Sequence, residues 1–244
     1  MIEGRVSRPS VDRSVIPRLY LSDPEAGIRI LKNASPPVPQ RLKPRKSPAQ
    51  ARSGATVDAI HEAVIQVLIA DGLTRLTTTR VAERAGVSVG TLYQYFPNKE
   101  SLLFAILQLH FEEMADAIEH VGKHDGKRSL RELAKNIAEA YVSVKVSRPD
   151  ATAALYRVAG AIDQFRLSPD VYRRLQAAVV HLLENASDAS FQNTRQTAFT
   201  LLSALAGLAR SSFGAVASDQ QVLERLRDEA VLLATAYLEA AAAQ

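Results

Sequence analysis

The sequence contains no cysteine and only five histidines among its 244 residues. Without cysteine there are no disulfide bonds and no thiolate metal sites. No run of 18 apolar residues occurs, and the first residues lack the apolar segment of a secretory signal, so neither a membrane span nor a signal peptide is expected. These absences fit a cytoplasmic protein with no membrane partner.

The sequence also lacks the residue patterns of common enzymes. Covalent catalysis needs a nucleophile held beside a base, and phosphate transfer commonly uses a glycine-rich loop. The histidines are scattered, and no such loop occurs. We therefore expect a protein that is not an enzyme and that binds no metal and no cofactor.

Alanine and leucine dominate after residue 50, which favours an all-α fold. The net charge of +4 is unevenly distributed, because residues 1–52 hold 11 basic and four acidic side chains, whereas the rest of the chain holds 19 and 22. The same segment contains eight of the 11 prolines and cannot sustain a helix, so we predict a largely disordered basic arm over residues 1–52. Its end could follow DNA or remain a solvated tail. Residues Ile2–Arg5 match the recognition sequence of a protease used to remove affinity tags, so we do not expect them to belong to the fold.

The most informative stretch is residues 77–96, which predicts two short helices joined by a tight turn. Thr77 or Thr78 can cap the first helix, Thr79–Ala85, and Gly86 can end it in a left-handed conformation. Ser88 can cap the second helix, Val89–Tyr95, which ends before Pro97. Two helices joined in this way form a helix-turn-helix.

The second of these helices is expected to present polar side chains outward. Leu92 and Phe96 lie four residues apart and can face the core together. Glycine inside a helix costs about 1 kcal/mol relative to alanine. We expect that Gly90 lets the backbone approach the floor of a DNA groove. The remaining residues suit phosphates and base edges, and we expect them to face outward: Val89, Thr91, Tyr93, Gln94 and Tyr95.

Residues 82–103, AERAGVSVGTLYQYFPNKESLL, closely resemble the DNA-binding domain of the TetR family of bacterial transcriptional regulators. The resemblance spans about Ser53–Met114 and is strongest over Thr77–Leu103. It implies a nucleoid-associated regulator that binds double-stranded DNA at a palindromic operator. By position it implies phosphate contacts from Thr78, Thr79, Tyr93, Tyr95 and Lys99, base contacts from Val89, Gly90, Thr91 and Gln94, either kind from Arg80, and a place for Ser88 on the same surface.

Apolar spacing, caps and prolines predict further helices on both sides of this motif. We expect a DNA-binding domain over residues 53–98 and a helical effector-binding and dimerisation domain over residues 99–244, with about nine helices in all. Outside the motif, the expected helices are Thr56–Asp71, Lys99–Val121, Leu130–Val146, Asp150–Gly160, Pro169–Asn185, Thr194–Phe213 and Asp219–Ala242.

The last two predicted helices carry apolar residues on more than one side, which predicts a homodimer formed by both helices. The resemblance also implies a small-molecule effector. Polar-tipped side chains on otherwise apolar helices could orient it, although each tip could instead have an ordinary hydrogen bond in the core. The candidates are His110, Tyr141, Tyr156, Phe165 and His181. A repressor is the commoner behaviour in this family. The alternative function is a constitutive repressor or architectural helix-turn-helix protein without a ligand.

Overall fold

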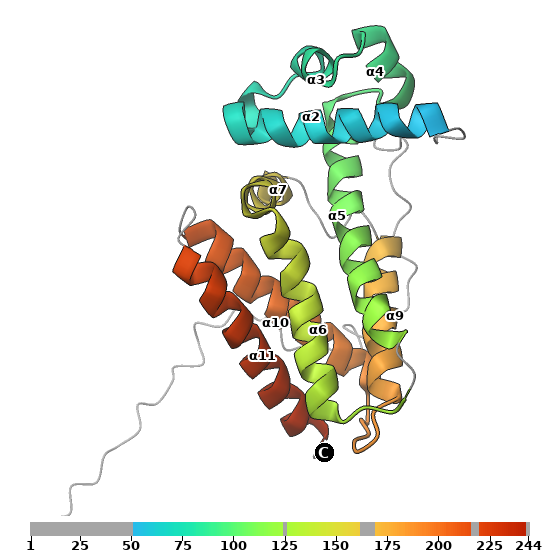
Figure 1. Ribbon diagram of the computed structural model, residues 1–244, viewed down its shortest axis with the longest axis vertical. Coiled ribbons are helices and arrows are strands. Elements are labelled where there is room, and N and C mark those ends of the chain that lie inside the picture. Colours follow the sequence, from blue (N-terminus) through green and yellow to red (C-terminus); the bar gives the residue numbers. More distant parts are fainter. Residues whose placement is uncertain (1–50, 124–125, 162–168, 216–219, 243–244) are drawn as a thin grey trace, which may run out of the picture. The chain divides into compact units, whose positions relative to one another are not determined.

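The computed structural model describes residues 51–123, 126–161, 169–215 and 220–242 (Figure 1). The predicted arm over residues 1–52 therefore lies almost entirely outside the described residues, as does Phe165. Within the described ranges the secondary structure is helical, apart from one isolated bridge between Arg128 and Ala186. The prediction of an all-α fold is confirmed.

The helices begin and end close to the residues that the sequence predicts. The largest difference is the first one, which begins at Ala51 rather than Thr56. Its predicted end is confirmed as a break, because Gly72 has φ 74° and ψ 175° inside the helix. In chain order the helices are α2 (Ala51–Arg75), α3 (Thr78–Ala85), α4 (Val89–Tyr95), α5 (Lys99–Gly122), α6 (Leu130–Ser147), α7 (Pro149–Ala161), α9 (Pro169–Glu184), α10 (Thr194–Ala215) and α11 (Gln220–Ala242).

Capping side chains fix the beginnings of α5, which follows the helix-turn-helix, and of α6. The Asn98 side chain accepts from the Ser101 backbone N–H at 2.8 Å, and Ser101 in turn holds the Asn98 N–H at 3.3 Å. Ser129 and Glu132 form the predicted capping box at the beginning of α6. Each cap satisfies backbone donors that a helix leaves free in its first turn.

One apolar core lies beneath the helix-turn-helix. It joins Ile60 and Leu68 of α2, Val81 of α3, Leu92 of α4 and the first two turns of α5. Three residues of α7 belong to the same core, namely Ala154, Leu155 and Val158. Figure 1 shows α7 crossing below α2 on the side opposite α3 and α4. Helix α2, which contributes to the core beneath the helix-turn-helix, thus packs against α7.

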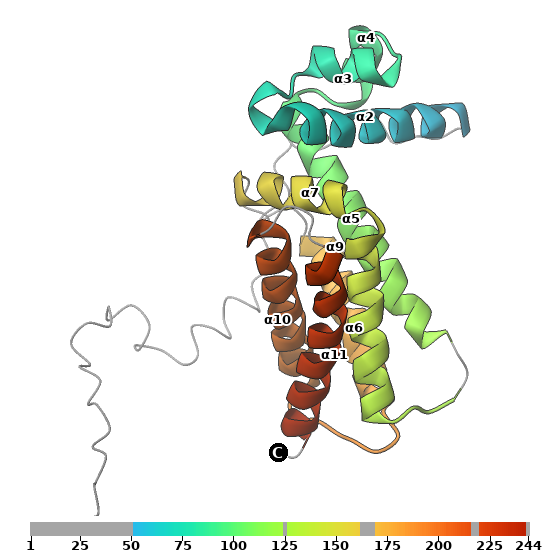
Figure 2. The ribbon, with the colours of Figure 1, turned by 60° about the vertical axis from the view of Figure 1, so that its left-hand side comes forward.

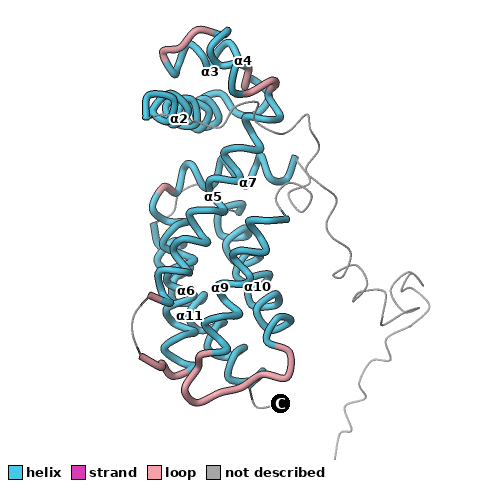
Figure 3. The backbone as a smooth tube through the Cα atoms, turned by 90° about the vertical axis from the view of Figure 1, so that its right-hand side faces the viewer, coloured by secondary structure: helices cyan, strands magenta, loops and turns pink. Residues whose placement is uncertain are grey.

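A second core lies between α6, α9, α10, α11 and the last part of α5. Figure 2 shows α10 and α11 side by side, with α6 next to them, and Figure 3 shows the loops that join these helices at the end remote from α2. Helix α5 enters both cores, because Leu102–Leu107 are buried in the first, whereas Met114, Ala115 and Ile118 are buried in the second. No helix among the described residues is long and apolar enough to span a membrane.

Candidate nucleic-acid interface

The turn between α3 and α4 has the geometry that its sequence predicts. Thr77 caps α3, where its hydroxyl accepts from the Arg80 backbone N–H at 3.3 Å. Gly86 has φ 68° and ψ 27°, in the left-handed region, and its N–H donates to the Glu83 carbonyl at 3.2 Å. Val87 N–H returns to the Ala82 carbonyl at 3.0 Å. These bonds close the end of α3 and turn the chain directly into α4.

Ser88 fixes the beginning of α4. Its hydroxyl accepts from the Thr91 backbone N–H at 2.9 Å and lies 2.8 Å from the Thr91 hydroxyl. The buried Leu92 and Phe96 side chains, exposed by 0% and 2%, anchor the opposite side of the helix in the core. The helix is therefore held at one end by its cap and along one side by packing.

The outward side of α4 carries an exposed polar surface together with α3. Tyr93 is 40% exposed, and its hydroxyl lies 3.1 Å from the Thr78 hydroxyl across the two helices. Gln94, Thr79 and Arg80 are also exposed. Arg80 donates to Asp71 at 2.9 Å, which orients its guanidinium from α2. Hydroxyl, amide and guanidinium groups on one surface can donate to phosphate oxygens and to base edges.

Two residues of the predicted interface are placed differently from the expectation. Tyr95 was predicted to face outward, and that orientation is wrong, because its side chain is only 8% exposed and packs near Phe96. With Leu92 three residues earlier on the same side, Tyr95 follows the helical spacing of the core. Lys99 is half-buried, and its ammonium donates to the Leu73 carbonyl at 2.7 Å. Lys99 thus already has an acceptor near the break in α2.

Gly90 lies on the exposed side of α4 with no steric reason for glycine inside the protein. A Cβ atom at this position would meet only the Ser88 Oγ atom, at an ordinary contact distance of 3.7 Å. Val89 and Thr91 beside it are half-buried. The fold of the protein alone therefore leaves room for a Cβ atom at position 90, although the residue there is glycine.

Three of the five candidate effector residues meet around a side chain that sequence reasoning missed. Lys145 of α6 is 4% exposed, and its Nζ atom lies 2.7 Å from His110 Nε2. The same atom lies 5.5 Å from the Tyr141 ring centroid and 5.1 Å from that of Tyr156. Lys145 continues the spacing of Leu133, Ile137 and Tyr141, which are each four residues apart on the buried side of α6. A lysine at the next position of this apolar spacing was the signal in the sequence that could have indicated a buried charge.

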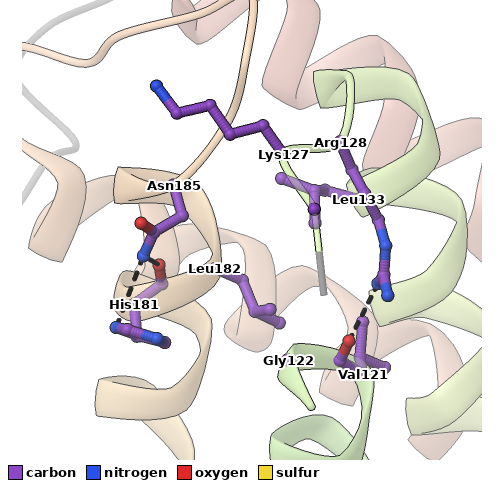
Figure 4. Close-up of a pocket in the computed structure, with 9 residues that line it drawn as sticks. Val121, Gly122, Lys127, Arg128, Leu133, His181, Leu182 and Asn185 are labelled. Carbon is purple, nitrogen blue, oxygen red and sulfur yellow. Dashed lines mark hydrogen bonds between the residues drawn. The ribbon is translucent and has the colours of Figure 1, made fainter. Parts of the chain in front are cut away.

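His181 does not join this cluster. It lies on α9 beside a groove of about 370 Å³ near the end of α5, with Val121, Leu133 and Leu182 (Figure 4). Its backbone carbonyl accepts from the Asn185 side chain at 2.7 Å. Val121 lies eleven residues beyond His110 on α5, which corresponds to roughly 16 Å along a helix. The predicted grouping of His181 with the other candidates is therefore not observed.

Burial shifts the pKa values of the Lys145 cluster toward the neutral forms. Desolvation lowers the pKa of Lys145 to about 7, and the Glu113 carboxylate raises it by a smaller amount. Burial likewise lowers the pKa of His110 and raises the pKa values of Tyr141 and Tyr156. Among the described residues there is no group of three side chains suited to hold a metal ion.

The all-α fold and the capped, core-anchored helix pair define a helix-turn-helix DNA-binding regulator. The profile of bacterial regulatory proteins of the tetR family matches residues 60–106, and that of the tetracyclin repressor-like C-terminal domain matches residues 129–238. The chain belongs to the TetR family of transcriptional regulators.

Curated relatives resemble the DNA-binding part of this chain. The nucleoid occlusion factor SlmA of Actinobacillus pleuropneumoniae is 44% identical over 50 residues, which cover 18% of this chain and 25% of that protein. The fatty acid metabolism regulator protein of Bacillus subtilis is 34% identical over 62 residues, or 25% of this chain and 30% of that protein. The chain thus spans about a quarter of the length of the curated relatives it matches.

Solved structures share the fold over most of the chain. A TetR-family transcriptional regulator from Mesorhizobium loti superimposes with a TM-score of 0.61 at 18% identity, over 78% of this chain and 98% of the other. The fatty acid degradation regulator FadR from Bacillus halodurans gives a TM-score of 0.59 at 20% identity, over 78% and 96%. At this level of identity the likeness concerns the fold.

Proposed function

We propose that the protein is a ligand-responsive repressor that binds a palindromic operator as a homodimer and is released by a small effector with apolar surface. The observation that carries the proposal is the exposed polar surface of α4, held rigidly by the Ser88 cap and the core beneath it. A recognition helix must be fixed in this way to present side chains to base edges in the major groove.

The residues of this surface divide between two kinds of DNA contact. Phosphate oxygens can accept hydrogen bonds from the hydroxyl groups of Thr78 and Thr79 on α3 and of Tyr93 on α4. Gln94 and Thr91 suit base edges, through amide hydrogen bonds and a methyl contact. Neither arginine nor asparagine occurs in α4. Specificity in this proposal therefore rests on Gln94, on close approach at Gly90 and on DNA shape.

Helices α10 and α11 support the dimer proposal. Phe199 and Leu232 are 37% and 63% exposed, although each is a large apolar side chain on a helix of the second core. Ala206 and Gly207 are also exposed on α10, where they would let a partner helix approach closely. An isologous contact of these two helices would form a four-helix interface about a two-fold axis.

Release by an effector requires different affinities of the effector for two arrangements of the dimer. Binding in the second core would favour a separation of the recognition helices that no longer matches successive major grooves. A coupling of about 1–3 kcal/mol would change the DNA affinity by roughly 5- to 150-fold. This is a hypothesis for the mechanism, and an effector that bound without altering operator affinity would disprove it.

The proposal is tested with labelled intergenic DNA flanking the native gene, titrated at two salt concentrations. Wild type is compared with Gln94→Ala and with Gln192→Ala, which changes an exposed glutamine in the loop before α10 and serves as the matched control. We expect saturable binding that Gln94→Ala weakens by about tenfold, as for a lost base contact, and that Gln192→Ala leaves intact. Weak binding that disappears with salt and is equal in all three proteins would contradict the proposal.

A further inference from the structure

The ammonium group of Lys145 has more donors than the core offers acceptors. It carries up to three N–H groups, and its hydrogen-bond partner among the described residues is a single atom, His110 Nε2, at 2.7 Å. On its other sides lie the rings of Tyr141 and Tyr156, which attract a cation by their faces but accept no conventional hydrogen bond. Within the part of the chain that the structure describes, two donor positions therefore have no conventional acceptor.

No carboxylate in the described part of the chain forms an ion pair with Lys145. The carboxylate that acts on it electrostatically is Glu113, which approaches the far side of the imidazole, 3.8 Å from His110 Nδ1. The Glu113 side chain is 56% exposed, whereas that of His110 is 11% exposed. The imidazole thus lies between the buried amine and the Glu113 carboxylate that acts on it.

A third donor belongs to Tyr156, whose ring faces the Lys145 ammonium. The Tyr156 hydroxyl is buried without a hydrogen bond of good geometry, although Tyr141 lies close enough to affect its pKa. Arg210 of α10 adds a further positive charge that acts on Tyr156. Phe213 packs against the Tyr156 ring with 5.9 Å between ring centroids. Unsatisfied donors, positive charge and aromatic surfaces thus meet at one place between α5, α6, α7 and α10.

We propose that this cluster binds the carboxylate of an amphipathic organic acid, with Lys145 and the Tyr156 hydroxyl as donors and the aromatic rings against its apolar body. The inference rests on the proposed function, because it names the chemical class of the effector. A carboxylate supplies several acceptor sites and one negative charge, which are the two things that the cluster lacks. A neutral ester of the same body supplies neither the charge nor equivalent acceptors.

Binding of this kind is linked to proton uptake. At pH 8 the buried amine is largely neutral, because desolvation holds its pKa near 7. A carboxylate beside it favours the charged form, so the amine takes up a proton when the acid binds. The titratable groups around the Lys145 amine are His110 and Glu113 from α5, Tyr141 from α6 and Tyr156 from α7. Arg210 from α10 acts on Tyr156.

The test uses two matched pairs of probes, decanoate with methyl decanoate and 4-phenylbutyrate with its methyl ester. Binding to the full-length protein is measured by calorimetry at pH 8 in phosphate and in Tris, whose ionisation enthalpies differ. We expect at least one acid to bind about tenfold or more tightly than its ester, with proton uptake. Lys145→Met should abolish both the preference and the uptake.

Lys127→Met, at an exposed lysine beside the groove of Figure 4, is the control and should behave as wild type. The inference is overturned if neither acid binds to wild type at millimolar concentration, if ester and acid bind equally, or if Lys145→Met keeps the preference. Operator binding by the ligand-free wild type is measured in parallel. Intact operator binding without a carboxylate preference refutes this inference alone, whereas absent operator binding refutes the proposed function.

Discussion

Lys145 places a titratable amine in a core that offers it a single polar side-chain contact. Such a group is expected to destabilise the fold whenever it is charged, because taking an ammonium out of water carries a large free-energy penalty. The penalty falls on the protonated form, so its effect depends on pH in a direction that can be predicted.

The stability of wild type relative to Lys145→Met is expected to rise with pH above 7. The pKa is about 7 in the folded protein and near 10.5 in the unfolded chain, so between these values the unfolded chain binds more protons. The free energy of unfolding therefore increases with pH in this window, by about 2 kcal/mol between pH 7 and 9. Below pH 7 the two proteins should keep a constant difference, with the methionine variant more stable.

Urea unfolding of both proteins at pH 6, 7, 8 and 9 measures this change. Lys127→Met, which removes an exposed lysine, is the control and should run parallel to wild type. A difference between wild type and Lys145→Met that stayed constant up to pH 9 would show that the amine is not desolvated as the structure indicates.

A second residue-scale prediction concerns Gly90, where the protein has room for a methyl group. Gly90→Ala should stabilise the fold by up to about 1 kcal/mol, because alanine favours a helix. The same change should weaken operator binding by about tenfold or more if the backbone of α4 approaches the groove floor. Thermal melting and DNA titration are measured together, with Gly54→Ala in α2 as the control. A variant that is more stable and binds DNA normally would remove close approach as the reason for glycine.

The individual residues show where sequence reasoning succeeds and where it stops. Gly86 and Ser88 act through hydrogen bonds to neighbours within four or five residues, so their roles could be predicted from sequence alone. Tyr95 and Lys145 depend on which side of a short helix meets the rest of the fold. For Lys145 the four-residue spacing after Tyr141 was a signal of burial that sequence reasoning missed. Its partner, His110, lies on another helix, so the distance between them depends on how the two helices pack.

At the scale of elements, a chain of polar contacts joins α3 to the junction between α6 and α7. Arg84 of α3 donates to Gln66 of α2 at 2.8 Å, and Gln66 donates to Glu62 at 3.0 Å. Glu62 accepts two bonds from Arg148, at 2.7 and 3.1 Å, and the hydrogen bond to Arg148 lowers the pKa of Glu62. Arg148 stands between α6 and α7, only three residues beyond Lys145. These contacts therefore connect the motif, through α2, to the junction between α6 and α7.

The Glu62–Arg148 pair is expected to contribute little to stability, because both side chains are nearly half exposed. A double-mutant cycle with Glu62→Gln and Arg148→Gln should give a coupling of at most about 1 kcal/mol, which 0.5 M salt should largely remove. The unfolding free energies of the four proteins at low and high salt measure it. A coupling that is larger and independent of salt would mean that the pair is effectively buried in solution.

The helices themselves were predictable, whereas their contacts were not. Caps, prolines and apolar spacing are local signals, and they predicted the first residue of α4, α5, α6, α9 and α10 correctly. The beginning of α2 was missed by five residues, because no capping residue marks it in the sequence. The role of α7 was not predicted either. Its residues 154, 155 and 158 join the DNA-binding core, and this depends on the packing of α7 beneath α2.

At the scale of the whole molecule, α7 contacts two different parts of the structure. Its Leu155 side belongs to the core that supports the recognition helix, and its Tyr156 side faces Lys145. An acid bound at Lys145 would compete with the Tyr156 ring for the ammonium group. Any displacement of that ring acts on a helix that already contacts α2, so the proposed effector site and the proposed DNA surface share one element.

A displacement of α7 can change operator affinity in this proposal only if the protein is a dimer. Two recognition helices read half-sites about 34–36 Å apart only when their protomers are held together. Leu232→Glu places a charge at an exposed large apolar side chain of α11 and should shift the protein toward monomer in sedimentation measurements. Operator affinity should fall with it, because each half-site then binds alone. Leu109→Glu, at an exposed leucine on α5, should leave the dimer intact. If Leu232→Glu and Phe199→Glu both remained dimeric, the two-fold interface would have to lie on other helices.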